Sequence, residues 1–126
     1  MSEPAQMRID GEWVNQNGST VELQEHNGVL SGHYLSRKGR SAAGKKYPLS
    51  GIRNGAVLAF HVNWQDEQAN LESITSFSGR VVLDASNEPT IHTLWTLVRR
   101  WEDQAQTKNT GAWNAFLTNA DVFTRM

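Results

Sequence analysis

Residues 11–25 read GEWVNQNGSTVELQE, and this stretch decides the fold. Apolar and polar side chains alternate within Gly11–Gln16 and within Thr20–Glu25, which is typical of β-strands with one buried face. Between the two segments stands Asn17-Gly18, a pair that tolerates the positive φ angles of a tight turn. The stretch therefore predicts a β-hairpin.

The same pattern continues along the rest of the chain. Six more alternating segments follow, separated by Gly, Asn, Asp and Ser: Val29–Ser36, Lys46–Ile52, Val57–Trp64, Ser73–Leu83, Thr90–Arg100 and Gly111–Thr124. No segment is both long and periodic at about 3.6 residues, so a parallel sheet with crossover helices is not expected. We predict an all-β fold, an eight-stranded antiparallel up-and-down β-barrel. Such a barrel can hold one small ligand, whereas a sandwich would leave sheet edges to protect.

The composition indicates one domain and argues against several kinds of function. A chain of 126 residues can bury one continuous core, with residues 1–8 expected as a flexible tail before a barrel domain of residues 9–126. The chain has 12 Lys and Arg and 13 Asp and Glu, so its net charge is too small to attract it to nucleic acid or a membrane. The lack of cysteine excludes disulfides, thiolate catalysis and Cys-ligated metals. No run approaches the roughly 18 apolar residues of a membrane span.

An ordered set of residues resembles the avidin and streptavidin family. The set covers nearly the whole chain and comprises Gly11–Ser19, Gly32–Ser36, Trp64, Ser73–Gly79, Thr93–Leu97, Trp113 and Asp121–Arg125. The resemblance implies a barrel that binds biotin and is not an enzyme, with biotin as its ligand and no cofactor. It also favours a secreted protein whose signal has been removed over a cytoplasmic one.

The resemblance assigns a polar cluster to the ureido group of biotin. Asn15, Ser19 and Tyr34 would donate hydrogen bonds to the ureido oxygen, while Ser36 and Asp121 would accept from the two ureido nitrogens. The ureido oxygen and the two ureido nitrogens each need a partner, because an unpaired buried polar group costs about 1 to 3 kcal/mol.

Other residues would contact the rest of the ligand. By the same resemblance, Thr75 would face the thioether sulfur and Ser73 would bind the valeryl carboxylate. The bicyclic ring would lie between apolar side chains, namely Trp64, Phe77, Trp95 and Leu97.

The alternation of strand side chains tests this assignment without the family. Successive side chains point to opposite faces, so residues that line one cavity must share parity within each strand. The candidate residues do so: Trp13 with Asn15, Tyr34 with Ser36, Ser73 with Thr75 and Phe77, Trp95 with Leu97, and Asp121 with Phe123. Such an interior is too polar for an empty core.

Two features favour a homo-oligomer, with a tetramer preferred to a dimer. Trp113 matches the tryptophan that a neighbouring subunit contributes to the site in the family. An apolar group faces away from the predicted lining, where an isolated barrel would expose it to water: Val14, Leu35, Ile74, Leu94 and Val98.

The sequence departs from the family in three places. Asn17 stands where members commonly carry Leu, which removes one hydrophobic contact. The connection Arg37–Lys45 is longer than in streptavidin and rich in basic residues, which suggests closure over the site and attraction of the biotin carboxylate. The connection Glu102–Thr110 is also longer, so the placement of Trp113 and a dimeric alternative stay open.

Other interpretations of the same residues remain. Asn15 and Ser19 can simply shape the turn, the aromatic residues can fill the barrel, and Asp121 can act as a turn residue. The rival functions are a small β-barrel carrier of another hydrophobic or carbohydrate ligand, and a structural interaction domain. An enzyme is not expected, because the four histidines lack metal-ligand spacing and no nucleophile elbow or phosphate loop is present.

Overall fold

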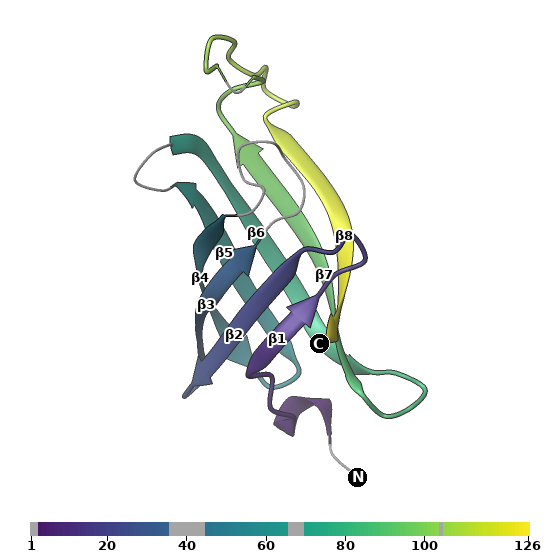
Figure 1. Ribbon diagram of the computed structural model, residues 1–126. Helices are drawn as coiled ribbons and strands as arrows, with labels where there is room; N and C mark the ends of the chain where they lie inside the picture. Colours follow the sequence, from purple (N-terminus) through teal and green to yellow (C-terminus); the bar gives the residue numbers. More distant parts are fainter. Residues whose placement is uncertain (1–2, 36–44, 66–69, 104) are drawn as a thin grey trace.

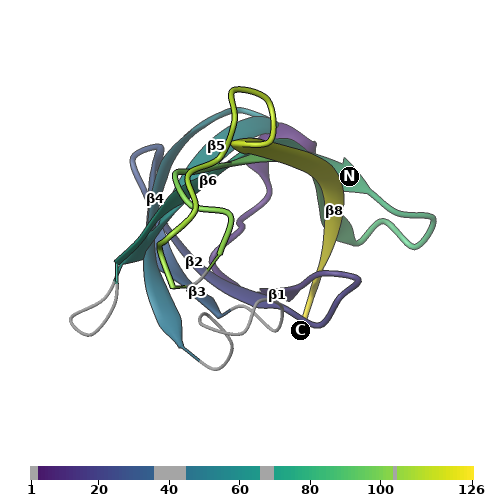
Figure 2. The same cartoon turned by 90° about the horizontal axis from the view of Figure 1, so that it is seen from above.

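The structure is a computed structural model that describes residues 3–35, 45–65, 70–103 and 105–126. A short 3-10 helix, η1 (Pro4–Gln6), precedes the strands. These are β1 (Gly11–Val14), β2 (Thr20–His26), β3 (Val29–Leu35), β4 (Lys46–Asn54), β5 (Val57–Gln65), β6 (Asn70–Leu83), β7 (Pro89–Arg99) and β8 (Phe116–Arg125). Each strand pairs antiparallel with the next and β8 pairs with β1, so the sheet forms a closed ring (Figure 1, Figure 2). The predicted eight-stranded up-and-down barrel is confirmed.

The first strand is shorter than its alternation predicts. β1 ends at Val14 rather than at Gln16, because the chain turns at Asn15. The backbone N–H of Asn15 donates to the carbonyl of Ser19 at 2.9 Å, and that of Gly18 donates to the carbonyl of Asn15 at 3.1 Å. Gln16 therefore lies in a turn.

The last strand also begins later than predicted. It starts at Phe116 rather than at Gly111, because the N–H of Ala115 donates to the carbonyl of Gly111 at 3.1 Å and closes a turn. The N–H of Phe116 donates to the carbonyl of Trp113 at 3.3 Å. Trp113 thus belongs to the connection between β7 and β8, not to a strand.

Alternate residues of the strands fill the barrel interior. On β5, for example, Leu58, Phe60, Val62 and Trp64 are buried, and the residues between them are exposed or half-buried. The buried apolar cluster comprises Ile9, Trp13, Val21, Leu23, Leu30, Tyr34, Tyr47, Leu49, Leu58, Phe60, Val62, Trp64, Phe77, Val81, Ile91 and Phe123. Burial of this kind stabilises a fold by about 25 cal/mol per Å² of apolar surface.

Gly32 allows β2 and β3 to approach closely. A Cβ at this position would lie 1.8 Å from the backbone oxygen of Glu22, and the φ angle of +146° is unfavourable for other residues. A side chain at residue 32 would therefore push the two strands apart.

The two ends of the barrel are built differently. One end, here the closed end, carries η1 and the β2–β3, β4–β5 and β6–β7 turns; the other, the open end, carries the β1–β2 and β7–β8 connections (Figure 1). At the closed end, the side chain of Arg53 is 5% exposed and ion-pairs with Glu25 at 2.9 Å. It also donates to backbone carbonyls of Pro4, Ala5, Met7 and Gly55.

This arginine connects the first residues of the chain to the barrel. Of the expected tail at residues 1–8, Pro4–Gln6 form η1, and Ile9 beyond it is fully buried. The indole N–H of Trp13 donates to the carbonyl of Ile9 at 3.0 Å. No helix among the described residues is long and apolar enough to cross a membrane.

A candidate ligand-binding site in the barrel

The turn that follows β1 directs Asn15 into the barrel. The Oδ1 atom of Asn15 accepts from the backbone N–H groups of Asn17 and Ser19, each at 3.0 Å. Because these partners are donors, the other end of the amide must be Nδ2, and it donates to Tyr34 Oη at 3.4 Å and to Asp121 Oδ2 at 3.2 Å. Asn15 therefore shapes the turn and also presents a donor inside the barrel.

Polar residues from β1–β2, β3 and β8 meet in one buried cluster. Asn15, Ser19, Tyr34 and Asp121 are each at most 7% exposed. The side chain of Ser19 hydrogen-bonds the hydroxyl of Tyr34. Burial and the negative charge of Asp121 raise the pKa of Tyr34 to about 12, against the lowering effect of the Ser19 and Asn15 hydrogen bonds. The phenol is thus a neutral hydrogen-bonding group at physiological pH.

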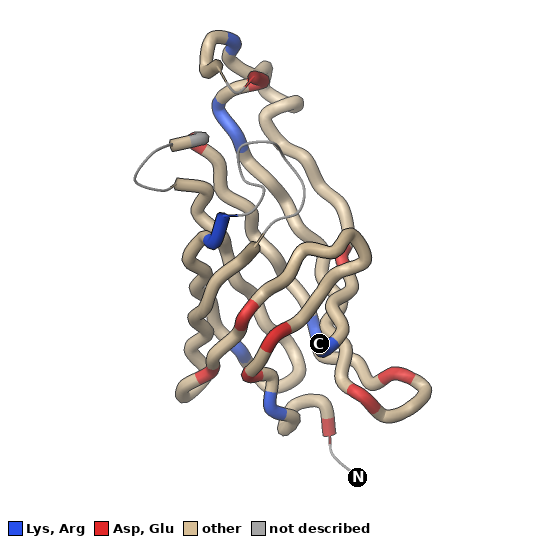
Figure 3. Tube along the Cα trace, viewed as in Figure 1, with Lys and Arg blue, Asp and Glu red and all other residues tan. Residues whose placement is uncertain are grey.

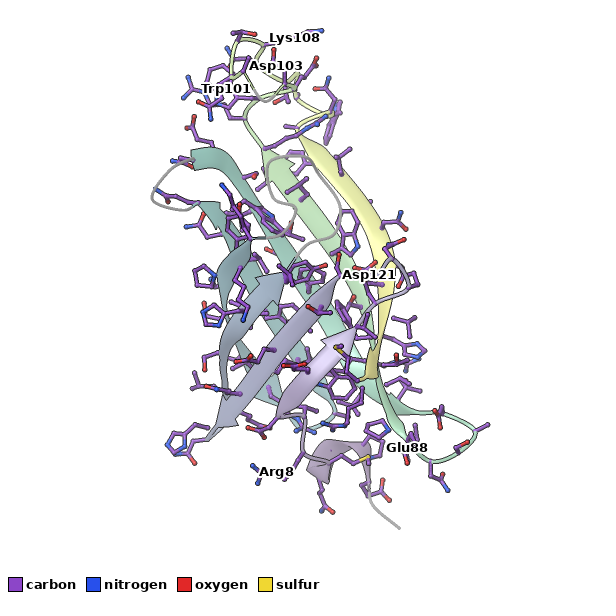
Figure 4. The ribbon with its side chains drawn as sticks, viewed as in Figure 1. Arg8, Glu88, Trp101, Asp103, Lys108 and Asp121 are labelled. Atoms are coloured by element: carbon purple, nitrogen blue, oxygen red, sulfur yellow. The ribbon has the colours of Figure 1, made fainter. Side chains whose placement is uncertain are left out.

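The carboxylate of Asp121 receives neutral amide donors. Oδ1 accepts from Gln16 Nε2 at 2.8 Å, and Oδ2 accepts from Asn15. The backbone oxygen of Asp121 accepts from the hydroxyl of Thr93 at 3.1 Å. Figure 4 shows Asp121 on β8, beside the β1–β2 connection. Each oxygen has lone pairs beyond these bonds, so the carboxylate can accept from a further donor.

Aromatic side chains adjoin the polar cluster. The ring of Tyr34 stacks on Phe77 at 5.7 Å and meets Trp64 edge to face at 5.6 Å. Trp64 also packs against Tyr47 at 4.9 Å, and Phe77 stacks on Phe60 at 4.6 Å. These contacts form a continuous aromatic wall across β3–β6.

Thr75 is held by the same wall. Its Oγ1 accepts from the indole N–H of Trp64 at 2.8 Å, and the residue is buried. Because the hydroxyl oxygen is the acceptor in this bond, its own proton remains available for another acceptor. Trp64 thus sets the direction in which Thr75 can donate.

Three other predicted residues lie on β6 and β7, and a fourth falls outside the described residues. Trp95 and Leu97 are half-buried on β7 and pack against the core, and Nε1 of Trp95 is buried with no hydrogen-bond partner among the described residues. Ser73 is half-buried on β6, opposite Arg99. Ser36, the predicted ureido acceptor, lies outside the described residues. Residues 37–44 of the basic connection lie outside them too.

The connection from β7 to β8 is a folded extension of the barrel. Trp101 pairs with Asn109 in an isolated bridge, and Lys108 ion-pairs with Glu102 at 2.9 Å. Basic and acidic residues lie side by side in this connection, which carries Trp101, Asp103 and Lys108 at one tip of the molecule (Figure 3, Figure 4).

Glu72 ties this connection to the start of β6. Its carboxylate accepts from Trp101 Nε1 at 2.8 Å and from Arg100 at 3.2 Å, and these bonds lower the pKa of Glu72. The guanidinium of Arg100 lies 4.2 Å from the centre of the Trp101 ring. Trp113, on the same connection, is 87% exposed and does not line its own barrel.

Sequence profiles place the chain in a known family. The profile of the avidin family matches residues 3–126. The chain belongs to the avidin family. Afifavidin from Afifella pfennigii is 37% identical over 91 residues, which cover 71% of this chain and 57% of afifavidin. Hoefavidin from Hoeflea phototrophica is 30% identical over 95 residues, which cover 68% of this chain and 57% of hoefavidin. The matches thus span little more than half of each curated relative.

Solved avidins share the fold. Apo shwanavidin superposes with a TM-score of 0.77 at 27% identity, covering 100% of both chains. The rhizavidin–biotin complex superposes with a TM-score of 0.76 at 28% identity, covering 94% of this chain and 92% of rhizavidin. The avidin barrel described above is therefore shared along the whole chain.

Some residues of the candidate site were not predicted as part of it. Tyr47 and Phe60 share parity with the buried Leu49 and Val62, so the alternation of β4 and β5 carried a usable signal. No sequence pattern indicated Gln16, because its partner Asp121 is 105 residues away along the chain.

Proposed function

We propose that the chain binds biotin inside the barrel without catalysing a reaction. The observation that carries the proposal is one buried polar cluster, in which Asn15 donates to Tyr34 and to the carboxylate of Asp121 and Ser19 bonds the hydroxyl of Tyr34. The cluster can offer two hydroxyls and the Asn15 proton that now meets Tyr34 at 3.4 Å to an acceptor, and a carboxylate to a donor. A cyclic urea presents one strong acceptor and two N–H donors, so it satisfies both kinds of group. The rhizavidin structure holds biotin in the same fold.

The surroundings strengthen these bonds. A hydrogen bond from a ureido N–H to Asp121 is charge-assisted, and about twice as strong as a neutral one. The cluster is buried, so water competes weakly for its atoms. The donors are already positioned by the turn and the strands, which lowers the entropic cost of association. Ser36 would supply the second acceptor for the ureido group.

The remaining predicted residues would bind the rest of biotin. The proton of Thr75 would point to the thioether sulfur, and Ser73 would bind the carboxylate. The apolar rings would lie against Trp64, Phe77, Trp95 and Leu97. Burial of the rings stabilises the complex by about 25 cal/mol per Å².

We also propose that the chain forms a homo-oligomer. The outward apolar residues expected on β6 and β7, Ile74, Leu94 and Val98, are exposed, and Leu94 is 68% exposed. Val98 pairs with Ile74 on one side and with Phe116 on the other, so the apolar residues adjoin across three strands. A second copy of the chain would cover this face, and Trp113 would reach the neighbour's site in a tetramer.

Light scattering tests the assembly. Leu94→Lys should reduce the particle mass, because a charge would be buried at the contact. Val57→Lys is the matched control, since Val57 is exposed on β5, and it should leave the mass unchanged. A monomeric wild-type chain would contradict the proposal.

Calorimetry with biotin tests the ligand. We expect saturable 1:1 binding per chain, quenching of tryptophan fluorescence and a higher melting temperature, because the ligand binds only the native state. The absence of all three responses at saturating biotin would refute the proposal and favour a carrier of another small ligand.

A further inference from the structure

The ladder that closes the barrel is short. β1 and β8 are paired only through Trp13 with Arg125 and Val14 with Thr124, whereas β1 and β2 share four such pairs. Beyond Val14 the backbone of the first strand turns away from β8. The backbone of β8 continues next to this turn, and its N–H and C=O groups that point away from β7 still need partners.

The side chain of Gln16 provides these partners. Its Nε2 donates to the carbonyl of Ala120 at 3.1 Å, and its Oε1 accepts from the N–H of Val122 at 3.0 Å. The carboxamide carries the same donor and acceptor as a peptide group. Gln16 therefore extends the β1–β8 ladder with a side chain where the backbone of β1 has left it.

The second proton of the same amide reaches the candidate site. Nε2 donates to Asp121 Oδ1 at 2.8 Å, while Asn15 Nδ2 donates to Oδ2 at 3.2 Å. All hydrogen-bonding atoms of the Gln16 amide are thereby used. Each oxygen of the Asp121 carboxylate is held by a donor from the turn after β1, so the orientation of the carboxylate depends on both amides.

We infer that Gln16 is a positioning residue that sets the Asp121 carboxylate for its ligand while it bridges the barrel seam. The inference rests on the proposed biotin function and deepens it. Gln16 itself is exposed and follows the end of β1, so it acts on the ligand through Asp121. Its role is to hold an acceptor in one orientation before the ligand arrives, which favours slow dissociation.

A double-mutant cycle separates this role from a purely structural one. Gln16→Leu should raise the dissociation rate of biotin about tenfold, since hydrogen bonds to charged groups are the stronger class. In an Asp121→Ala background, the same substitution should add little, because the residue it acts through is gone. Gln24→Leu is the matched control, since Gln24 is an exposed glutamine on β2, and it should leave the rate unchanged.

Gln16→Glu sharpens the test. This substitution keeps the side-chain length and an oxygen that can accept from the N–H of Val122. It removes both N–H donors and places a second carboxylate next to that of Asp121. It should therefore accelerate dissociation more than Gln16→Leu does. The inference would be overturned if Gln16→Leu raised the dissociation rate by the same factor in the wild-type and Asp121→Ala chains, or changed it in neither. If Asp121→Ala does not fold, Asp121→Leu serves as the second background.

Hydrogen exchange tests the bridge without biotin. The amide of Val122 should exchange slowly in the unliganded wild-type chain and faster in Gln16→Leu, with melting curves checking that both are folded. Equal exchange in the two proteins would overturn the bridge. A wild-type chain that fails to bind biotin would refute the proposed function, and this exchange experiment would still decide on the bridge.

Discussion

The closed and open ends of the barrel are built from the same strands but bury different kinds of side chain. At the closed end, Trp13 and Ile9 are fully buried, and Arg53 donates to four carbonyls around η1. Nearer the open end, Tyr34 and Asp121 are also buried but polar, and amides and hydroxyls pair with them. The closed end should therefore determine stability, and the polar cluster should determine binding.

The largest expected effect is the removal of the central tryptophan at the closed end. Trp13→Ala should lower the free energy of unfolding by about 3–5 kcal/mol, because it leaves a cavity and an unpaired carbonyl at Ile9. The guanidinium of Arg125 also loses the ring that lies 4.4 Å away. Urea denaturation measures this loss, and a loss below about 1 kcal/mol would show that the closed end is not the stabilising region.

Arg53 tests whether η1 seals the barrel. Arg53→Met should cost about 2–3 kcal/mol in unfolding free energy, because carbonyls and the Glu25 carboxylate lose a buried donor. Arg80→Met is the control: Arg80 is exposed on β6, and surface substitutions usually change stability by about 0.5 kcal/mol or less. Biotin affinity should not change in either variant. A loss of affinity in Arg53→Met would show that the two ends are coupled.

The raised pKa of Tyr34 predicts a loss of stability in alkali. The folded chain keeps the phenol proton up to about pH 12, whereas the unfolded chain releases it near pH 10. Stability should thus fall by about 2–3 kcal/mol as the pH rises from 10 to 12, a value that follows from the two-unit difference. Denaturation at several pH values checks this, with Tyr34→Phe as the reference. An identical decline in both proteins would contradict the prediction.

The smallest expected change in free energy concerns binding alone. Tyr34→Phe removes one donor but keeps the ring stacked on Phe77, so biotin affinity should fall about tenfold. The free energy of unfolding at neutral pH should change by less than about 1 kcal/mol, since the ring packing stays. Calorimetry and urea denaturation measure the two quantities. A large loss of stability with unchanged affinity would reverse the division between the two ends.

Local patterns predicted much of this architecture. The alternation of residues 57–64 predicted one buried face of β5, and Asn27-Gly28 and Asn54-Gly55 predicted the turns at the closed end. The parity of Trp13 with Asn15 also placed these side chains on the buried face of the barrel. These features depend on neighbours in the chain, where steric preferences and alternation act directly.

The ends of the strands and the long-range contacts were harder to predict from the sequence. Gly111–Ala115 was expected to begin the last strand, but a turn forms there because its carbonyls find partners within the connection. The contact of Arg53 with Pro4 of η1 joins residues 49 positions apart, and its approach depends on the closed sheet. Patterns within a strand carry no information about such contacts.

The sequence by itself determined the order of the strands, the face that each strand buries and the family to which the chain belongs. Only the tertiary structure decided that the amide of Gln16 meets Asp121 and the edge of β8. The physical reason is closure: β1 and β8 stand at opposite ends of the chain, and their side chains meet only when the last ladder forms.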